Sequence, residues 1–317
     1  MNLALIGLGP FCSNYHIPNL LARSDIKITA ICDISQDRLD GRDERLTAAA
    51  TYTDSHELLD SANIDGVIVS TPNASHFEIC RDAINRDIPV LVDKPITVRS
   101  EDAQELVDLS KRRDCILMTA YTRHFMPSTE YVRRRILSGE IDVQTISAVQ
   151  RRSKIKATTK DGGMLHRRTV HVLDLLTWMT DRSIVSVSAD IKYEEANIEE
   201  EYLELEVELE GGLRSQILCI KNCEDYQDEV NIYGSNGSYR LERPRLFELD
   251  KAGWHPVEDL PDYGNATDHF VDALLGKIPG PDDPTLDRHS EDGLRAVRIV
   301  EALHESARTG RPVAVPK

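Results

Sequence analysis

The chain has 317 residues, and its 38 basic against 54 acidic side chains give a formal net charge of −16 at pH 7. This charge argues against nucleic acid or an anionic membrane as a partner. The sequence shows no apolar stretch long enough to span a bilayer and no signal-like start, so we expect a cytoplasmic protein. The length favours two domains over one.

The six cysteines show no metal-type spacing, and several of them lie inside apolar runs. Thiols in such positions behave as small hydrophobic side chains. We therefore expect reduced, buried cysteines and no metal site.

The first apolar run, residues 3–6, is followed by Gly7 and Gly9 and then by a segment that can form a helix. This order is typical of a buried strand that turns into a helix whose N-terminus binds the pyrophosphate of a dinucleotide. Gly7 would allow the tight turn, and Gly9 would keep side-chain bulk away from the phosphates. Where this motif has a third glycine, the chain has Cys12. The cofactor-binding residues expected in this loop are Gly7, Gly9, Pro10, Phe11 and Cys12.

A second apolar run, residues 26–32, ends at Asp33, at about the twenty-residue distance that the motif requires. The carboxylate of Asp33 can accept hydrogen bonds from the adenosine ribose hydroxyls, and it would repel a 2′-phosphate. The sequence therefore favours NAD over NADP. Arg38 and Arg42 are nearby positive charges that would instead favour NADP. The alternative is that Asp33 is a solvated carboxylate in a turn.

Up to about Ala120, short apolar runs alternate with amphipathic stretches, which is the pattern of βαβ units and a parallel sheet. The expected strands are 3–6, 26–32, 66–70, 90–92 and 115–119, and the expected helices are 14–22, 55–60, 75–86 and 100–112. Residues 1–120 are therefore interpreted as a nucleotide-binding domain of the α/β class.

After Tyr121, a helix at 128–137 is followed by long alternating runs that are typical of a largely antiparallel sheet. The expected strands are 144–151, 184–193, 202–210, 213–222, 229–233 and 238–242. Helices are expected again at 266–275 and 291–309, with a surface loop at 276–287 between them. Residues 121–317 are interpreted as an α+β domain built on a large, mostly antiparallel open sheet, whose last helix could pack back on the first domain. The open face of the sheet would allow a homodimer or homotetramer.

Polar residues follow directly on the expected strands 66–70 and 90–92, at the carboxyl edge where ligands bind in doubly wound folds. Lys94, held by the proline after it, could exchange a proton with a substrate near the nicotinamide. The alternative is a surface lysine in a turn. The cofactor-binding candidates at this edge are Ser70, Thr71, Pro72, Asn73, His76, Asp93 and Lys94.

Together these segments resemble the glucose–fructose oxidoreductase and inositol dehydrogenase family, called Gfo/Idh/MocA, over nearly the whole chain. In the first domain the resemblance is carried by the glycine loop with His16, by Thr71-Pro72-Asn73 with His76, and by Asp93-Lys94-Pro95, where the family usually has Glu-Lys-Pro. It continues in the segment 121–127, in Gly162-Gly163-Met164-Leu165 with His171 and Asp174, in the turn 234–238 and in the closing residues 310–313.

The resemblance implies a Rossmann-type first domain and hydride transfer between a nicotinamide cofactor and a hydroxyl or carbonyl carbon of a sugar, cyclitol or related polyol. By position, Lys94 would hydrogen-bond the reacting oxygen, and His171 would be a proton relay or substrate anchor. Asp174 would lie one helical turn further on and orient His171 or bind a substrate hydroxyl. The alternative for His171 and Asp174 is an interior position on an amphipathic helix. Arg123 and Arg167 are further substrate-binding candidates.

One position departs from the family pattern. Four residues before His171, inositol-dehydrogenase-like members usually have an aspartate that shares the proton transfer, and this chain has Arg167 there. An arginine stays charged near neutral pH and cannot be a general base. Either Lys94 and His171 handle the proton alone, or the chemistry differs from polyol oxidation.

A basic run precedes this segment within an otherwise acidic chain; it consists of Arg151, Arg152, Lys154, Lys156 and Lys160. We hypothesise that some of these residues, with Arg167, bind an anionic substrate group such as a carboxylate, a phosphate or a nucleotide-sugar diphosphate. The alternative is a solvated charged loop. Two other functions stay open: an NAD-assisted glycosidase, and a non-catalytic cofactor sensor or partner-binding protein.

Overall fold

The computed structural model describes residues 1–153, 163–193, 200–278 and 284–316. It divides into two compact units, Met1–Tyr121 with Asn265–Leu294 and Thr122–Gly264 with Arg295–Lys317. The chain therefore returns to the first unit after it has built most of the second. No helix of the described residues is both long and apolar enough to cross a membrane.

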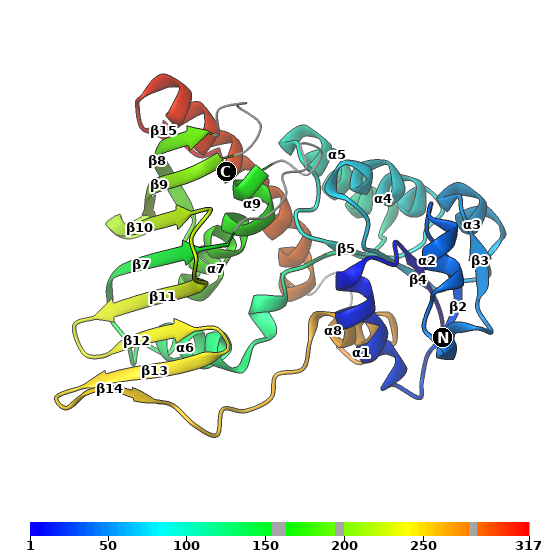
Figure 1. The fold of residues 1–317 in the computed structure, drawn as a ribbon, viewed down its shortest axis with the longest axis horizontal. Coiled ribbons are helices and arrows are strands. Elements are labelled where there is room, and N and C mark those ends of the chain that lie inside the picture. The colour runs from blue at the N-terminus through cyan, green and yellow to red at the C-terminus, as the bar shows by residue number, and fades with distance from the viewer. Residues whose placement is uncertain (154–162, 194–199, 279–283, 317) are drawn as a thin grey trace. The chain divides into compact units, whose positions relative to one another are not determined.

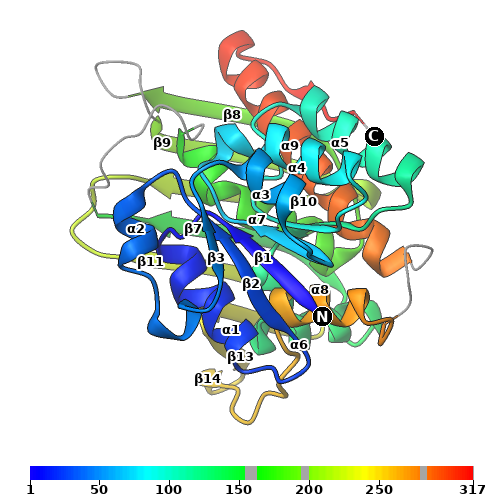
Figure 2. The same cartoon turned by 90° about the vertical axis from the view of Figure 1, so that its right-hand side faces the viewer.

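The first unit is built on a parallel sheet with the strand order β3-β2-β1-β4-β5-β6. Helices α3, α4 and α5 cover one face of this sheet, and α1 and α8 cover the other (Figures 1 and 2). Because both faces are covered, the central strands are almost continuously apolar and buried. The strands are β1 (Asn2–Ile6), β2 (Lys27–Cys32), β3 (Ala50–Tyr52), β4 (Gly66–Val69), β5 (Val90–Asp93) and β6 (Leu117–Ala120). The helices are α1 (Ile17–Leu21), α2 (Gln36–Asp40), α3 (Ser55–Ser61), α4 (His76–Asn85), α5 (Ser100–Arg113) and α8 (Ala266–Leu274).

Helix α8 packs into the first unit although it is far from the other helices in sequence. A Cβ on Gly66 of β4 would lie 2.8 Å from the side chain of Leu274 and 3.4 Å from that of Phe270. Arg23, just after α1, forms ion pairs with Asp268 and Asp272 of α8. The small residue on β4 and these charges fit α8 to the sheet.

The second unit is built on a sheet with the strand order β14-β13-β12-β11-β7-β10-β9-β8-β15, which Figure 1 shows edge to edge. Among the described residues all neighbouring strands are antiparallel except β7 and β10. Alternation is clear in β9, where leucine and valine side chains are buried and the glutamates between them are exposed or half-buried. The strands are β7 (Val143–Arg151), β8 (Ile184–Tyr193), β9 (Glu200–Leu209), β10 (Leu213–Ile220), β11 (Gln227–Gly234), β12 (Ser238–Glu242), β13 (Arg245–Asp250), β14 (Gly253–Pro256) and β15 (Val313–Ala314). The α-helices are α6 (Pro127–Leu137), α7 (Val170–Thr180) and α9 (Pro284–Thr309), of which α9 belongs to this unit from Arg295 on.

The α/β fold class is confirmed, with a parallel first sheet and a mostly antiparallel second one. Most expected elements are present, but the short β3, β15 and α2 and the hairpin of β13 and β14 were not expected. These elements have two to six residues and contain no apolar run longer than two residues, unlike the equally short but apolar β1 and β4, so their sequences show too little pattern to be recognised. The loop expected at 276–287 is wrong from Pro284 on, where α9 begins, because proline is well suited to the first position of a helix. Residues 279–283 of that loop lie outside the described residues.

Candidate active site

The glycine loop leaves β1 where the backbone has no room for a side chain. Gly7 has a φ of +93°, and a Cβ on it would lie 2.4 Å from the carbonyl oxygen of Ser70 at the end of β4. By contrast, a Cβ on Gly9 would meet nothing within 4 Å among the described residues. The fold itself therefore requires Gly7. The open space beside Gly9 fits the close approach of a pyrophosphate to the backbone.

Cys12 begins η1 (Cys12–His16), a π-helical turn that leads into α1. Its side chain is fully buried. Burial, with smaller effects from Asp93 and Asp33, raises the pKa of its thiol far above the usual value. Cys12 thus takes the position of the third glycine as a small apolar side chain and not as a nucleophile. Pro10 and Phe11, which precede it, are exposed.

Asp33 follows β2 and fixes the glycine loop. Its Oδ2 accepts a hydrogen bond from the backbone N–H of Leu8 at 2.8 Å, and its Oδ1 accepts one from the N–H of Ser35 at 2.9 Å. Arg38 lies 3.3 Å from Oδ2. Each carboxylate oxygen can accept more than one hydrogen bond, so Oδ1 keeps acceptor capacity for a ribose hydroxyl. Arg42 instead donates to the carbonyl oxygen of Leu39.

The loops after β4 and β5 are tied together by two side chains. His76, fully buried, has Nδ1 2.8 Å from the carbonyl oxygen of Pro95 and Nε2 2.9 Å from that of Thr71. Ser70 donates its hydroxyl hydrogen to Oδ2 of Asp93. The expected residues Pro72 and Asn73 lie in the same loop, where η3 (Asn73–Ser75) precedes α4. The candidate residues after β4 and after β5, which are distant in sequence, are thus held side by side at the carboxyl edge of the sheet.

Asp93 also connects this edge to η1 and α8. Its Oδ1 lies 3.0 Å from Nε2 of His16, whose Nδ1 lies 2.9 Å from the hydroxyl of Thr267. Burial acts to raise the pKa of Asp93, but His16 and the hydrogen bonds from His16 and Ser70 outweigh it and lower that pKa overall. Lys94 comes directly after this anchored carboxylate and is half-buried. Sequence reasoning missed Thr267, which is 251 residues from His16.

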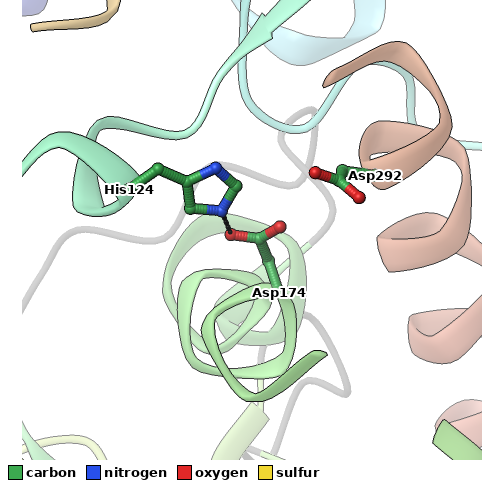
Figure 3. Close-up of side chains that lie close together, drawn as sticks. All are labelled: His124, Asp174 and Asp292. Atoms are coloured by element: carbon green, nitrogen blue, oxygen red, sulfur yellow. Dashed lines mark hydrogen bonds and ion pairs between the residues drawn. The ribbon is translucent and has the colours of Figure 1, made fainter. Parts of the chain in front are cut away.

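In the second unit, Asp174 on α7 pairs with His124 and not with His171. Figure 3 shows the His124 ring beside the Asp174 carboxylate, and Nε2 lies 2.7 Å from Oδ2. His124 comes from η4 (Thr122–Phe125), and its ring stacks on Trp178, with centroids 4.4 Å apart. The structure thus gives Oδ2 of Asp174 a partner that the sequence did not predict, while Oδ1 is buried without a hydrogen-bond partner among the described residues. The role of Asp174 toward His171 or a substrate hydroxyl stays a prediction. No motif in the sequence marked His124 as that partner.

His171 and Arg167 lie at a change of helix type. Residues 165–169 form the π-helical turn η6 (Leu165–Thr169), and α7 follows it directly. Both side chains are half-buried. The two π-helical turns of the described chain, η1 and η6, thus coincide with the two segments in which site residues were expected, as π-turns often do at functional sites. Gly162 and the basic residues Lys154, Lys156 and Lys160 lie outside the described residues.

Arg123 is the other substrate-binding candidate in this unit, and its guanidinium is buried. Nη2 of Arg123 lies 2.6 Å from Oδ2 of Asp228 on β11, and Nη2 of Arg152 lies 3.4 Å from the same oxygen. Arg151 forms a more exposed ion pair with Asp225 at 3.0 Å. Of the basic run, Arg152 thus faces the interior and Arg151 the surface. Asp228 was not recognised from the sequence because it follows no motif.

The doubly wound sheet, the side-chain-free turn at Gly7 and the carboxylate at the end of β2 define a dinucleotide-binding protein with a second, sheet-based unit. Residues 1–121 match the model described as "Oxidoreductase family, NAD-binding Rossmann fold", and residues 131–240 match that of the "GFO/IDH/MocA C-terminal domain". The chain therefore belongs to the Gfo/Idh/MocA family. It is an NAD-dependent oxidoreductase, as the sequence predicted.

Individual relatives are distant in sequence. The chain is 26% identical over 194 residues to the "Myo-inositol 2-dehydrogenase" of Thermotoga maritima, which covers 60% of this chain and 58% of the relative. It is 23% identical over 326 residues to the "Inositol 2-dehydrogenase 2" of Saccharopolyspora erythraea, and this match covers 99% of this chain and 95% of the relative. The chain shares its fold with the WlbA dehydrogenase of Bordetella pertussis, whose crystal structure is in complex with NADH and UDP-GlcNAcA. The TM-score is 0.85 at 20% identity, and the match covers 100% of this chain and 99% of that one.

Proposed function

We propose that this oxidoreductase transfers a hydride between NAD and a hydroxyl or carbonyl carbon of a sugar, a cyclitol or a related polyhydroxylated molecule. The observation that carries this proposal is the anchored carboxyl edge of the first sheet. There Lys94 follows a carboxylate that is held by His16 and Ser70, in a loop that His76 ties to the loop after β4. The names of the two inositol dehydrogenases support the substrate class.

The cofactor would lie along the glycine loop, with Asp33 on the adenosine ribose, and would supply the site that accepts or donates the hydride. The further residues proposed to hold it are Gly7, Gly9, Pro10, Phe11, Cys12, Ser70, Thr71, Pro72, Asn73, His76, Asp93 and Lys94.

Lys94 is proposed to hydrogen-bond the reacting oxygen, to take its proton during oxidation and to return it during reduction. His171 is proposed as proton relay or substrate anchor, and Arg167 as a substrate-binding residue that stays charged. Asp174 is proposed to hold the ring of His124 in place, since its carboxylate already contacts that ring. We propose that Arg123 acts on substrate binding indirectly, through Asp228, its buried ion-pair partner.

Three further proposals complete this function. The substrate carries an anionic group, which the arginines beside Asp228 favour. The protein forms a homodimer or homotetramer through the open face of the second sheet. It acts in the cytoplasm, because its six cysteines are unpaired and all but Cys223 are buried.

The test is a screen of polyhydroxylated compounds for NADH formation by wild type, Lys94→Ala and Lys111→Ala. Lys111 is the matched control, a partly exposed lysine on α5 paired with Glu291. Loss of the general acid–base group is expected to lower turnover by roughly 10²–10⁴-fold in Lys94→Ala only. The affinity for NADH should be unchanged in Lys111→Ala and should fall far less than turnover in Lys94→Ala. Near wild-type turnover of Lys94→Ala would contradict the proposal, and release of free sugar without NADH would indicate a glycosidase.

A further inference from the structure

A row of polar side chains crosses three neighbouring strands in the second unit. Gln150 of β7 is in register with Cys219 of β10 on one side and with Asp228 of β11 on the other. The Cys219 thiol donates to Oε1 of Gln150, and the Gln150 amide donates to Oδ1 of Asp228, each at 3.4 Å. Thr169, the last residue of η6, contacts the Cys219 sulfur at 3.3 Å. The row therefore lies beneath η6 and ends at a buried carboxylate.

Two guanidinium groups share the Asp228 carboxylate. Arg123 and Arg152 both donate to Oδ2, and their side chains are only 5% and 13% exposed. The Arg152 guanidinium also stacks over the Tyr226 ring, 4.2 Å from its centroid. In both arginines Nε is buried and has no hydrogen-bond partner among the described residues. Two positive charges thus face one negative charge at a place that water hardly reaches.

Arg168 adds a third positive charge to this group. Within the described part of the chain, its guanidinium makes no hydrogen bond or ion pair. Burial, followed by the charges of Arg152 and Arg167, lowers its pKa, while Tyr226 and Asp228 act in the opposite direction. A partly buried guanidinium beside like charges that has lost hydration without gaining a partner among the described residues is costly unless an anion is bound.

We propose that Arg152 and Arg168, supported by Arg123, Tyr226 and Asp228, bind an oxyanion, namely a carboxylate or phosphoryl group of the substrate. The planar guanidinium fork matches the oxygens of such groups and binds them in bidentate fashion. Asp228 keeps Arg123 and Arg152 in position when no anion is bound. Because Arg168 is three residues before His171, the anion would fix the substrate against the helical segment that carries His171.

The inference can be tested by calorimetric titration of the full-length protein saturated with NADH, so that the pyrophosphate site of the glycine loop is filled. The probes are inorganic pyrophosphate, inorganic phosphate and glucuronate at one ionic strength, with glucose as the neutral control. Wild type is expected to bind at least one of the anions more tightly than it binds glucose. Tighter binding of the phosphates assigns a phosphoryl group, and tighter binding of glucuronate assigns a carboxylate.

The variants are Arg168→Gln and, as a matched control, Arg214→Gln, an arginine on β10 whose side chain is 79% exposed. Loss of the charged fork is expected to weaken anion binding at least about tenfold in Arg168→Gln only. Equal affinity in both variants, or no binding of any of the three anions by wild type, would overturn the inference. If Arg168→Gln does not fold, Arg168→Lys against Arg214→Lys decides, since lysine keeps the charge and loses the fork.

This inference rests on the proposed function only in naming the bound molecule as substrate, because the titration needs no turnover. If Arg168→Gln loses anion binding and wild type oxidises no polyhydroxylated compound, the anion site stands and the proposed reaction fails. If wild type and Arg168→Gln oxidise a neutral inositol equally and no anion binds, the reaction stands and the anion site is refuted.

Discussion

Gly7 and Gly9 differ in what the structure demands of them, so a pair of alanine variants separates folding from cofactor binding. In Gly7→Ala, a residue with a Cβ would adopt a φ of +93°, which costs about 1–2 kcal/mol. The Cβ would also meet the Ser70 carbonyl oxygen at 2.4 Å, and moving that backbone group costs about 1–3 kcal/mol. The sum of about 2–5 kcal/mol corresponds to a melting temperature lower by roughly 4–20 °C.

Gly9→Ala is the matched control, because its Cβ would meet no described atom within 4 Å and its φ is not in the left-handed region. Its free energy of unfolding should stay within about 0.5 kcal/mol of wild type. Its dissociation constant for NADH should nevertheless rise at least about tenfold, because the methyl group would occupy the space for the pyrophosphate. Thermal unfolding and a fluorescence titration with NADH measure the two effects. The reasoning is refuted if Gly7→Ala melts like wild type, or if Gly9→Ala binds NADH like wild type.

Two further predictions concern cofactor choice and pH. The variant Asp33→Ser lacks the carboxylate that would repel a 2′-phosphate, so the ratio of NADPH affinity to NADH affinity should shift at least about tenfold toward NADPH. Fluorescence titrations with the two cofactors measure this ratio. An unchanged ratio would show that Asp33 does not select the cofactor. Burial holds the pKa of His76 below its usual value. Below about pH 6.5 the His76 side chain therefore binds more protons in the unfolded chain than in the folded one. As the pH falls through this range, the stability that neutral His76 contributes to the folded state is lost. Melting temperatures measured at pH 7.5 and 5.5 should show this loss of stability, which is at most about 1.4 kcal/mol per pH unit for His76. The melting temperature of His76→Gln should depend less on pH. An equal pH dependence of the melting temperature in wild type and His76→Gln would exclude His76 as its source.

The residues that follow strands were predictable because their positions depend on local pattern alone. A parallel sheet buried on both faces requires short apolar runs, and the residue after each run then lies at the carboxyl edge. Asp33, Ser70 and Lys94 could therefore be located from the sequence, and the family resemblance added His171. The alternating strands β7–β12 were recognised in the same way, from a period of two.

The partners of these residues were decided by tertiary structure. Asp174 pairs with His124, 50 residues away, and Arg123 pairs with Asp228, 105 residues away. His16 meets Thr267 because α8 returns to the first unit. Periodicity reports which face of an element is buried, but it carries no information on which distant segment packs against that face. For the same reason the sequence could show that Arg168 is charged, and only the fold could show that Arg152 and the carboxylate of Asp228 lie close enough to act on it.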